Sequence, residues 1–257
     1  MRAAVIYEPH VPLKVEELDL DDPKQEEVRV KLVGGGVCHS DYHRIDGHSA
    51  IGNSPFVMGH EGAGIVQKVG PGVTDFAPGD HVIFSLASPC GRCRNCTVGR
   101  PNLCEGHPRV GGMMPDGTTR FSKDGVPYYH GLATFAEETV VLADSLVKIR
   151  DDIPVEKACL ISCSVITGVG AVVNRAKVEA GSTVAVFGCG GVGLNAIQGA
   201  RLLNARKIIA VDIAANKLEW AKDFGATDVV DGRKIDAVEA IKELTGGLGV
   251  DYSFEAV

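Results

Sequence analysis

The sequence predicts an α/β protein of two parts, in which a β-rich, barrel-like part precedes a doubly wound parallel sheet. Residues 2–149 contain short β-type runs separated by Gly, Pro and Asp clusters, a pattern typical of a barrel-like domain. From residue 181 onward, strand-like and helix-like segments alternate, which is typical of parallel βα units. A chain of 257 residues with 45% hydrophobic residues is also long enough for two domains.

The first part contains six segments with the composition of strands, and a helical segment follows them. The predicted strands cover residues 3–8, 13–20, 27–33, 62–70, 80–84 and 134–141. Residues 155–178 predict a helical bridge whose first turn follows Pro154, a residue that suits the start of a helix. We place the domain boundary within this bridge, which gives a first domain of residues 1–164 and a second of residues 165–257.

The second part alternates between predicted strands and predicted helices. The strands cover residues 183–188, 207–212, 227–232 and 250–257, and the helices cover residues 191–204, 214–225 and 236–246. The last strand is apolar and should lie inside the sheet, with a neighbour on each side. Because a bare apolar edge favours aggregation, we expect the chain to be incomplete after its fourth strand.

Charge and hydropathy restrict the class of partner. The formal net charge is -7, and Lys and Arg are scattered among acidic residues, which argues against a nucleic-acid or anionic-membrane surface. No apolar stretch is long and uninterrupted enough to span a bilayer. The N-terminal MRAAVIYEPH lacks the apolar region of a signal peptide. We therefore expect a cytoplasmic protein whose partner is a small molecule.

Four cysteines lie in the stretch PCGRCRNCTVGRPNLC, residues 89–104, with the spacing C-x2-C-x2-C-x7-C. In a reducing compartment clustered cysteines are more often metal ligands than disulfide partners. Four thiolates suit tetrahedral zinc and leave no open position for substrate, which predicts a structural zinc ion. An iron–sulfur cluster or a redox pair at CGRC is the competing interpretation, although the usual cluster spacing is absent. The predicted ligands are Cys90, Cys93, Cys96 and Cys104.

A glycine-rich stretch predicts a dinucleotide site in the second part. GCGGVG, residues 188–193, fits G-x-G-x-x-G and lies between a predicted strand and a helix that opens at the third glycine. Gly188 and Gly190 let the backbone approach a pyrophosphate, which the helix N-terminus then holds. Asp212 ends the next strand, where an acid binds the ribose 2′-hydroxyl and favours NAD over NADP. The alternative is a packing turn with Asp212 as a helix cap.

Cys189 lies in this loop. We expect the helix N-terminus to lower the pKa of its thiol, and we expect alkylation of the thiol to impair cofactor binding.

Further candidate metal ligands are dispersed along the first part. Cys38 lies in GGGVCHSDYH, His60 and Glu61 lie in MGHEGAGIV, and Cys163 lies in ISCSVITG, each beside small residues. In alcohol dehydrogenase the catalytic zinc ion is bound by two cysteines and one histidine, and its fourth coordination position is open. Sequence spacing alone does not assemble these residues, and a single cysteine is ordinarily a small buried hydrophobic residue.

Six motifs together make the sequence resemble the zinc-dependent medium-chain alcohol dehydrogenases over essentially its whole length. They occur in family order and are GVCHSDYH, GHEGAGIV, the four-cysteine loop, DGTTRF, ISCSVITG and VFGCGGVGL. The resemblance implies a GroES-like catalytic domain joined to a Rossmann cofactor domain, with the active site between them. It implies an enzyme that transfers a hydride from a primary or secondary alcohol to NAD+, giving an aldehyde or ketone. It also implies a homodimer or homotetramer when the chain is complete.

The resemblance implies two zinc ions per chain and a set of roles around them. The four-cysteine loop holds the structural ion, and the catalytic ion is bound by Cys38, His60 and Cys163, with Glu61 and Asp41 in the surrounding shell. Zinc in an open site polarises the substrate oxygen and promotes loss of its proton. Ser40 matches the first hydroxyl of the family's proton relay, and His43 matches its terminal base, for which the pKa of histidine is suited.

The resemblance also implies cofactor contacts outside the glycine pair. Gly191 and Gly193 complete the glycine motif, Thr167 and Val192 match positions that flank the nicotinamide, and Lys217 matches one that touches the adenosine ribose. His39 stands where some relatives place an arginine against the cofactor phosphate. For Thr167, Val192 and Lys217 the alternative is an ordinary core residue or a solvated helix charge.

Two alternative functions are open at this point. Residues 106–131 resemble the longer loop of certain alcohol and formaldehyde dehydrogenases, some of which keep the cofactor tightly bound. The first alternative is therefore a dehydrogenase for a formaldehyde adduct, or one with non-exchanging cofactor. The second is a non-enzymatic structural or regulatory zinc protein. The predicted proton relay argues against it, because a protein without catalytic activity does not need a proton relay.

Overall fold

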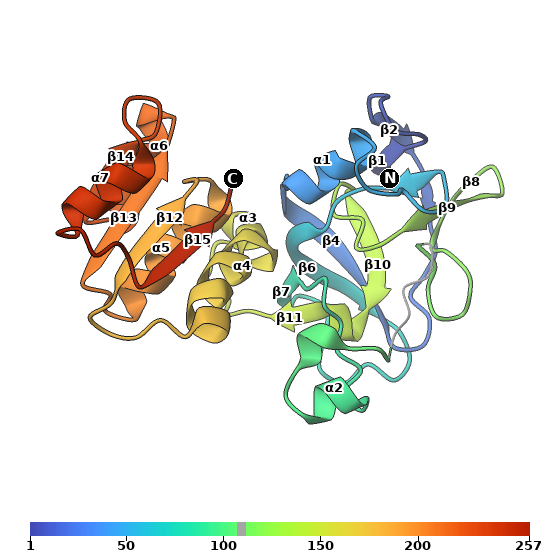
Figure 1. Cartoon of the computed structure of the whole chain (residues 1–257). Helices are drawn as coiled ribbons and strands as arrows, with labels where there is room; N and C mark the ends of the chain where they lie inside the picture. Colours follow the sequence, from blue (N-terminus) through green and yellow to red (C-terminus); the bar gives the residue numbers. More distant parts are fainter. Residues whose placement is uncertain (107–111) are drawn as a thin grey trace. The chain divides into compact units, whose positions relative to one another are not determined.

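The computed structural model describes residues 1–106 and 112–257, which form two compact units, Met1–Cys163 and Ser164–Val257 (Figure 1). Residues 107–111, which belong to the long loop identified in the sequence, lie outside the described residues. None of the eight cysteines forms a disulfide, and all eight lie in the described part of the chain.

The first unit is built on two β-sheets, as the barrel-like pattern predicted. One sheet has the order β2-β1-β5-β9-β8-β3 and the other has the order β10-β4-β6-β7-β11. Their bounds are β1 Arg2–Ile6, β2 Lys14–Glu17, β3 Asp19–Leu20, β4 Glu27–Gly36, β5 Phe56–Val57, β6 Glu61–Val69, β7 His81–Phe84, β8 Phe121–Lys123, β9 Val126–His130, β10 Glu138–Leu142 and β11 Leu146–Lys148. All six predicted strand segments contain strands, and β5, β8, β9 and β11 were not predicted from the sequence.

Strands β4 and β6 form the centre of the second sheet and position two of the candidate ligands. Val28 and Val30 of β4 are fully buried and pack with Val66 of β6 in one hydrophobic cluster. The two strands pair antiparallel with register shifts near Val30 and Gly34, and such bulges bend a strand. The candidate ligands flank this pair, because β6 begins at Glu61 and β4 ends two residues before Cys38.

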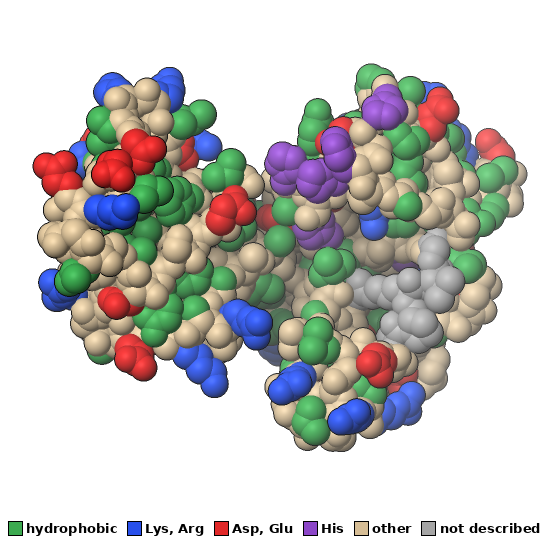
Figure 2. Space-filling model, in the orientation of Figure 1, with side chains coloured by type: hydrophobic (Ala, Val, Ile, Leu, Met, Phe, Trp, Pro, Cys, Tyr) green, Lys and Arg blue, Asp and Glu red, His purple; other side chains and the backbone are tan. Residues whose placement is uncertain are grey.

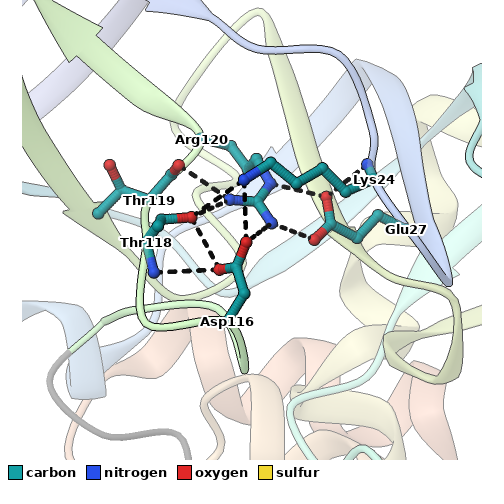
Figure 3. Close-up of polar contacts among 6 residues, drawn as sticks. All are labelled: Lys24, Glu27, Asp116, Thr118, Thr119 and Arg120. Carbon is teal, nitrogen blue, oxygen red and sulfur yellow. Dashed lines mark hydrogen bonds and ion pairs between the residues drawn. The ribbon is translucent and has the colours of Figure 1, made fainter.

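A buried ion pair fixes the beginning of β4, as Figure 3 shows. The Arg120 guanidinium donates to both carboxylate oxygens of Glu27, with Nε 2.7 Å from Oε2, and both side chains are buried. Asp116 accepts from Arg120 at 3.0 Å and from Lys24 at 2.9 Å. The DGTTRF motif therefore ties its own loop to β4.

Two short α-helices of the first unit were not predicted, α1 (His39–Ile45) and α2 (Arg94–Thr97). Helix α1 begins after Cys38, whose backbone N–H donates to the Asp41 side chain at 3.2 Å. A carboxylate that accepts an N–H in the first turn stabilises a helix start. Asp41 is the buried residue of this helix and faces the candidate site.

The predicted helical bridge is present but is interrupted at Cys163. It consists of α3 (Val155–Ala158), a 3-10 segment (Cys159–Ser162), α4 (Ser164–Gly170) and a π-helical segment (Ala171–Ala176). Cys163 has φ -141° and ψ -69°, which are not helical values. No single helix among the described residues is long and apolar enough to cross a membrane, and only the two segments on either side of this break reach that length and composition together.

The second unit is a parallel sheet with the order β14-β13-β12-β15 and helices on both faces, which confirms the predicted doubly wound fold. On one face Val184 and Val186 pack with residues of α5 and α6, and on the other Ala185 packs with residues of α7. Alternate residues of one strand thus cover opposite faces. The bounds are β12 Thr183–Phe187, α5 Gly191–Leu202, β13 Lys207–Asp212, α6 Ala215–Phe224, β14 Asp228–Asp231, α7 Ala237–Leu244 and β15 Tyr252–Glu255.

Candidate active site and structural metal centre

Four dispersed residues of the first unit meet at one point. Ligand atoms of Cys38, His60, Glu61 and Cys163 all lie within 4.8 Å of one another, and the two cysteine sulfurs are 4.0 Å apart. Two thiolates and one imidazole are a donor set that zinc prefers, so these residues fit a zinc ion. Glu61 is buried and offers a carboxylate oxygen within the same group, so the structure adds a further potential ligand to the three named from the sequence.

Asp41 orients the histidine of this group. Its Oδ1 lies 3.0 Å from His60 Nδ1, and the side chain of Asp41 is only 6% exposed. The hydrogen bond that the His60 ring donates to Asp41 is the main cause that raises the pKa of His60 to about 10. A carboxylate on Nδ1 fixes the ring orientation and leaves Nε2 for a metal ion, an arrangement common among metal-binding histidines.

The segment before Cys163 is attached to the same sheet that carries His60 and Glu61. The Ser162 hydroxyl donates to the Gly62 carbonyl oxygen at 2.8 Å, and this hydrogen bond is buried. The backbone break at Cys163 then turns its side chain out of the helical path. These two features bring Cys163 to Cys38, although 125 positions separate the two cysteines in the sequence.

The four-cysteine loop forms a second group of the expected composition. The ligand atoms of Cys90, Cys93, Cys96 and Cys104 lie within 4.8 Å of one another. The Cys93 sulfur is 3.5 Å from that of Cys96 and 3.9 Å from that of Cys104. Two sulfurs bonded tetrahedrally to zinc at ~2.3 Å would be about 3.8 Å apart, so these distances fit a zinc ion.

Backbone N–H groups of the loop favour thiolates. The Cys104 sulfur accepts from the N–H groups of Cys90 at 3.2 Å and Gly106 at 3.3 Å. These hydrogen bonds lower the pKa of Cys104, and backbone hydrogen bonds from Glu105 and Cys96 lower the pKa of Cys93 to about 6. Because only the thiolate binds metal, the backbone favours the ligand form at Cys93 and Cys104, whereas burial and the hydrogen bond with Cys93 raise the pKa of Cys96 to about 12.

In the second unit the glycines of the motif allow close packing at one position and leave the backbone open at another. A Cβ at Gly193 would lie 1.8 Å from the Gly188 carbonyl oxygen, so this glycine allows close packing of α5 against the loop. A Cβ at Gly190 would meet nothing within 4 Å, so the backbone there is open to a ligand. Helix α5 begins at Gly191, the first residue of the predicted helix, with Gly190 as its cap. The open backbone before a helix N-terminus fits a pyrophosphate.

Asp212 lies beside this loop and its carboxylate links two turns. It accepts from the Cys189 N–H at 2.7 Å and from the Ala214 N–H at 2.8 Å, and the Lys217 Nζ lies 4.0 Å from it. Although burial favours the neutral acid, the two backbone hydrogen bonds and Lys217 lower the pKa of Asp212. The structure thus brings the glycine loop, Asp212 and Lys217 together. Asp212 also supports the turn before α6, although the cap of that helix is Ala214 and not Asp212 as the alternative required.

The remaining predicted residues lie on short helices. Ser40 and His43 are on α1 with Asp41, and the His43 ring centroid is 4.6 Å from that of His39. In the second unit Thr167 lies on α4, next to Gly168, where a Cβ would lie 2.3 Å from the Val192 carbonyl oxygen. Close packing of α4 and α5 therefore places the segments of Thr167 and Val192 side by side.

The prediction of an activated thiol at Cys189 is wrong. Cys189 is fully buried, and its sulfur lies 3.8 Å from the Val211 carbonyl oxygen. Burial is the main cause that raises the pKa of Cys189 to about 11, and the negative charge of Asp212 adds to it. The helix N-terminus does not compensate, because the side chain points into the core and not toward the loop backbone.

The structure adds one group that sequence reasoning did not single out. Ligand atoms of His43, Asp46 and His48 lie within 4.8 Å of one another at the end of α1. His48 was assigned no role from the sequence. The spacing H-x2-D-x-H at the predicted relay histidine was the available signal, because residues i and i+3 share a helix face.

A barrel-like unit with two cysteine-rich groups, together with a parallel sheet that carries a glycine motif and an acidic residue, defines the class of zinc-dependent dehydrogenases. Comparison with known families agrees. Residues 24–151 match the alcohol dehydrogenase GroES-like domain, and residues 191–257 match the zinc-binding dehydrogenase domain.

Individual relatives support the same assignment. The chain is 47% identical over 262 residues to an S-(hydroxymethyl)glutathione dehydrogenase of Photobacterium damsela subsp. piscicida, covering 100% of this chain and 71% of the relative. A protein of the same name from Escherichia coli O1:K1 is 46% identical over 263 residues with the same coverage. Among solved structures, benzyl alcohol dehydrogenase from Acinetobacter calcoaceticus superposes with a TM-score of 0.90 at 35% identity, covering 100% of this chain and 70% of that one.

The chain therefore belongs to the zinc-dependent medium-chain alcohol dehydrogenase family. Members of this class are oxidoreductases that use zinc and NAD(H), and the chain is an alcohol dehydrogenase of this type. The predicted fold, a GroES-like domain followed by a Rossmann sheet, is confirmed by the same matches.

Proposed function

We propose that the first unit holds a catalytic zinc ion through Cys38, His60 and Cys163, and that the chain oxidises a primary or secondary alcohol with NAD+. The convergence of these residues with Glu61 within 4.8 Å is the observation that supports it. A zinc ion held there would act as a Lewis acid and lower the pKa of a substrate hydroxyl group. In this proposal residues 1–164 form the domain that binds substrate and zinc, and residues 165–257 form the domain that binds NAD.

Side chains of α1 supply the protein's part of the proton transfer. Ser40, on the exposed side of the helix, accepts the proton of the substrate hydroxyl as it gives up its own hydroxyl proton to the rest of the relay. His43, whose ring is half-exposed, releases a proton to solvent at the end of that relay. The pKa of histidine suits this final step near neutral pH. Asp41, on the opposite and buried side of α1, holds the His60 ring in place. One short helix therefore carries both the relay and the residue that orients a metal ligand.

The second unit binds NAD through its glycine loop. Gly188, Gly190 and Gly191 belong to the loop that holds the pyrophosphate at the start of α5, and Gly193 lets α5 pack against that loop. Asp212 accepts hydrogen bonds from the adenosine ribose. Lys217 lies within reach of the same carboxylate, which supports a contact with the ribose. Thr167 and Val192 bound the nicotinamide, and His39 contacts the cofactor phosphate.

The four-cysteine loop binds a second zinc ion with a structural role. Its four sulfurs complete a tetrahedron, so no position is left for substrate. We therefore expect two zinc ions per chain. We also propose a cytoplasmic location and a homodimer or homotetramer for the complete enzyme.

Two classes of substrate are candidates. The bacterial relatives at 46% to 47% identity are named for a formaldehyde adduct of glutathione, and a structural relative at 35% identity is named for benzyl alcohol. The higher identity favours the formaldehyde adduct. Parallel assays of NADH formation with S-(hydroxymethyl)glutathione and with benzyl alcohol distinguish the two.

The assignment of the catalytic ligands is tested by Cys163→Ser. We expect this variant to lose one of two zinc ions per chain and all turnover, because an alcohol side chain replaces one thiolate of the group. Elemental mass spectrometry and NADH absorbance measure the two effects. The matched control is Cys159→Ser, which changes a buried cysteine outside the group and should keep both ions. Unchanged zinc content in Cys163→Ser would refute the assignment.

A further inference from the structure

We propose that His43, Asp46 and His48 form a third site, an exchangeable one for a divalent transition-metal ion, on the surface of the first unit. Ligand atoms of the three residues lie within 4.8 Å of one another. Two imidazoles and a carboxylate are a donor set for zinc, nickel or iron(II). The site shares no residue with the two cysteine-containing groups.

The distances within the group suit one ion. Asp46 Oδ1 is 2.9 Å from His48 Nδ1, and Asp46 Oδ2 is 3.7 Å from His43 Nδ1. A metal bonded tetrahedrally to nitrogen and oxygen at ~2.1 Å places the two ligand atoms about 3.4 Å apart, which lies between the two values. Small rotations of these side chains, of which His48 is the most exposed, would therefore bring all three ligands to bonding distance.

His43 contributes a nitrogen that has no other partner. Its Nδ1 is buried and accepts or donates no hydrogen bond among the described residues, and 3.7 Å is too long for one to Asp46. A buried nitrogen without a partner is costly, and a metal ion would satisfy it. His48 and Asp46 already contact each other, so only His43 has to be recruited.

The backbone at the end of α1 holds the three residues in place. The Asp46 N–H donates to the Tyr42 carbonyl at 2.9 Å and the Ser49 N–H donates to the His43 carbonyl at 2.8 Å. The His48 N–H donates to Asp46 Oδ1 at 3.1 Å. These hydrogen bonds fold the turn back over the helix, so the ligands are partly preorganised. Figure 2 shows histidine side chains gathered at the surface of this unit.

A bound ion would also have a consequence for proton transfer, which rests on the proposed function. His43 is the terminal base of the proposed relay, and a metal on Nδ1 would occupy one of its two ring nitrogens and fix the ring in place. The site would then couple turnover to the concentration of free transition-metal ions, with excess metal inhibiting the enzyme.

Nickel binding tests the site independently of activity. Untagged protein that carries its zinc is titrated with NiCl₂ by isothermal calorimetry, and elemental mass spectrometry confirms that zinc is not displaced. We expect one nickel ion per chain, and we expect His48→Gln and Asp46→Asn to weaken binding about tenfold or more because each removes one of three ligands. His48 is 72% exposed on its side chain, so its replacement should leave fold and zinc content unchanged.

The matched control is His10→Gln, which removes an exposed histidine outside the group and should bind nickel as the parent does. Absence of saturable nickel binding, or binding that survives His48→Gln unchanged, overturns the site. If nickel binds as expected but does not slow NADH formation in the parent protein, the site stands and the expected inhibition by excess metal is overturned.

Discussion

Asp41 illustrates how a single side chain serves two purposes at this site. It accepts the Cys38 N–H at the start of α1 and it binds His60 Nδ1, so it connects two of the proposed ligands. Because it is buried, its charge interacts strongly with both groups. The residue type is therefore dictated by the metal site and by the helix start together.

Cys189 shows that the environment of a side chain can reverse an expectation based on its sequence position. We predict that iodoacetamide at about pH 8 leaves Cys189 unmodified in native protein, because a pKa of about 11 leaves only about one thiolate in a thousand. Peptide mass spectrometry before and after denaturation measures the labelling. Rapid labelling of native protein would contradict the burial that the structure shows.

At the scale of elements, the strand β4 depends on a buried ion pair at its beginning. Glu27 and Arg120 are almost inaccessible to solvent, and Thr118 and Asp116 complete the hydrogen bonding of the guanidinium (Figure 3). A buried charge is tolerated when all its partners are present and is costly when one is removed. The pair therefore holds the DGTTRF loop against the strand that leads to Cys38.

We predict that Glu27→Ala lowers the free energy of unfolding by about 3 to 5 kcal/mol, because it leaves the Arg120 charge buried and unpaired. Urea denaturation followed by circular dichroism measures the loss. Lys24→Ala is the control, since this lysine is half exposed and its contact with Asp116 contributes about 1 kcal/mol at most. Equal effects of the two variants would show that the pair does not anchor β4.

The helical bridge between the two units is interrupted at Cys163. The sequence pattern of residues 155–178 indicates a helix, and the structure interrupts it at the residue that must reach Cys38. A continuous helix would fix the direction of the Cys163 side chain by its helical phase. Non-helical backbone at this one position frees the thiol to join the metal group.

The two proposed zinc ions differ in how much the structure around them depends on the metal. Residues 90–104 contain no buried residue, so this loop has no hydrophobic core of its own. Where packing is absent, metal binding can supply the folding free energy of a segment. By contrast, the group around Cys163 is supported by Ser162, Asp41 and the packed strands of the sheet.

We predict that Cys104→Ser makes the four-cysteine loop sensitive to trypsin at Arg92 and Arg94, because the loop loses the ion that orders it. Mass spectrometry of the fragments identifies the cleavage sites. Cys163→Ser serves as the comparison and should leave the loop resistant. Cleavage at the same rate in both variants would mean that zinc does not order this loop.

Local patterns in the sequence determined the elements of the second unit and the two motifs with short spacing. Strand and helix periods are set by neighbouring residues, so β12 to β15 and α5 to α7 could be predicted. The four-cysteine loop was predictable for the same reason, because its ligands lie within one short stretch. In the first unit α1, α2 and four short strands were missed, since segments of two to seven residues give little periodic signal.

The tertiary structure alone decided which distant side chains meet and which are buried. Cys38, His60 and Cys163 come from three separate segments, and no spacing rule brings them together; before the structure, only resemblance to a family assigned them. Burial against β13 set the pKa of Cys189, and the turn after α1 placed His48 beside His43. The elements of the second unit could be predicted from the sequence because their causes are local, whereas ligand groups and pKa values depend on distances across the fold.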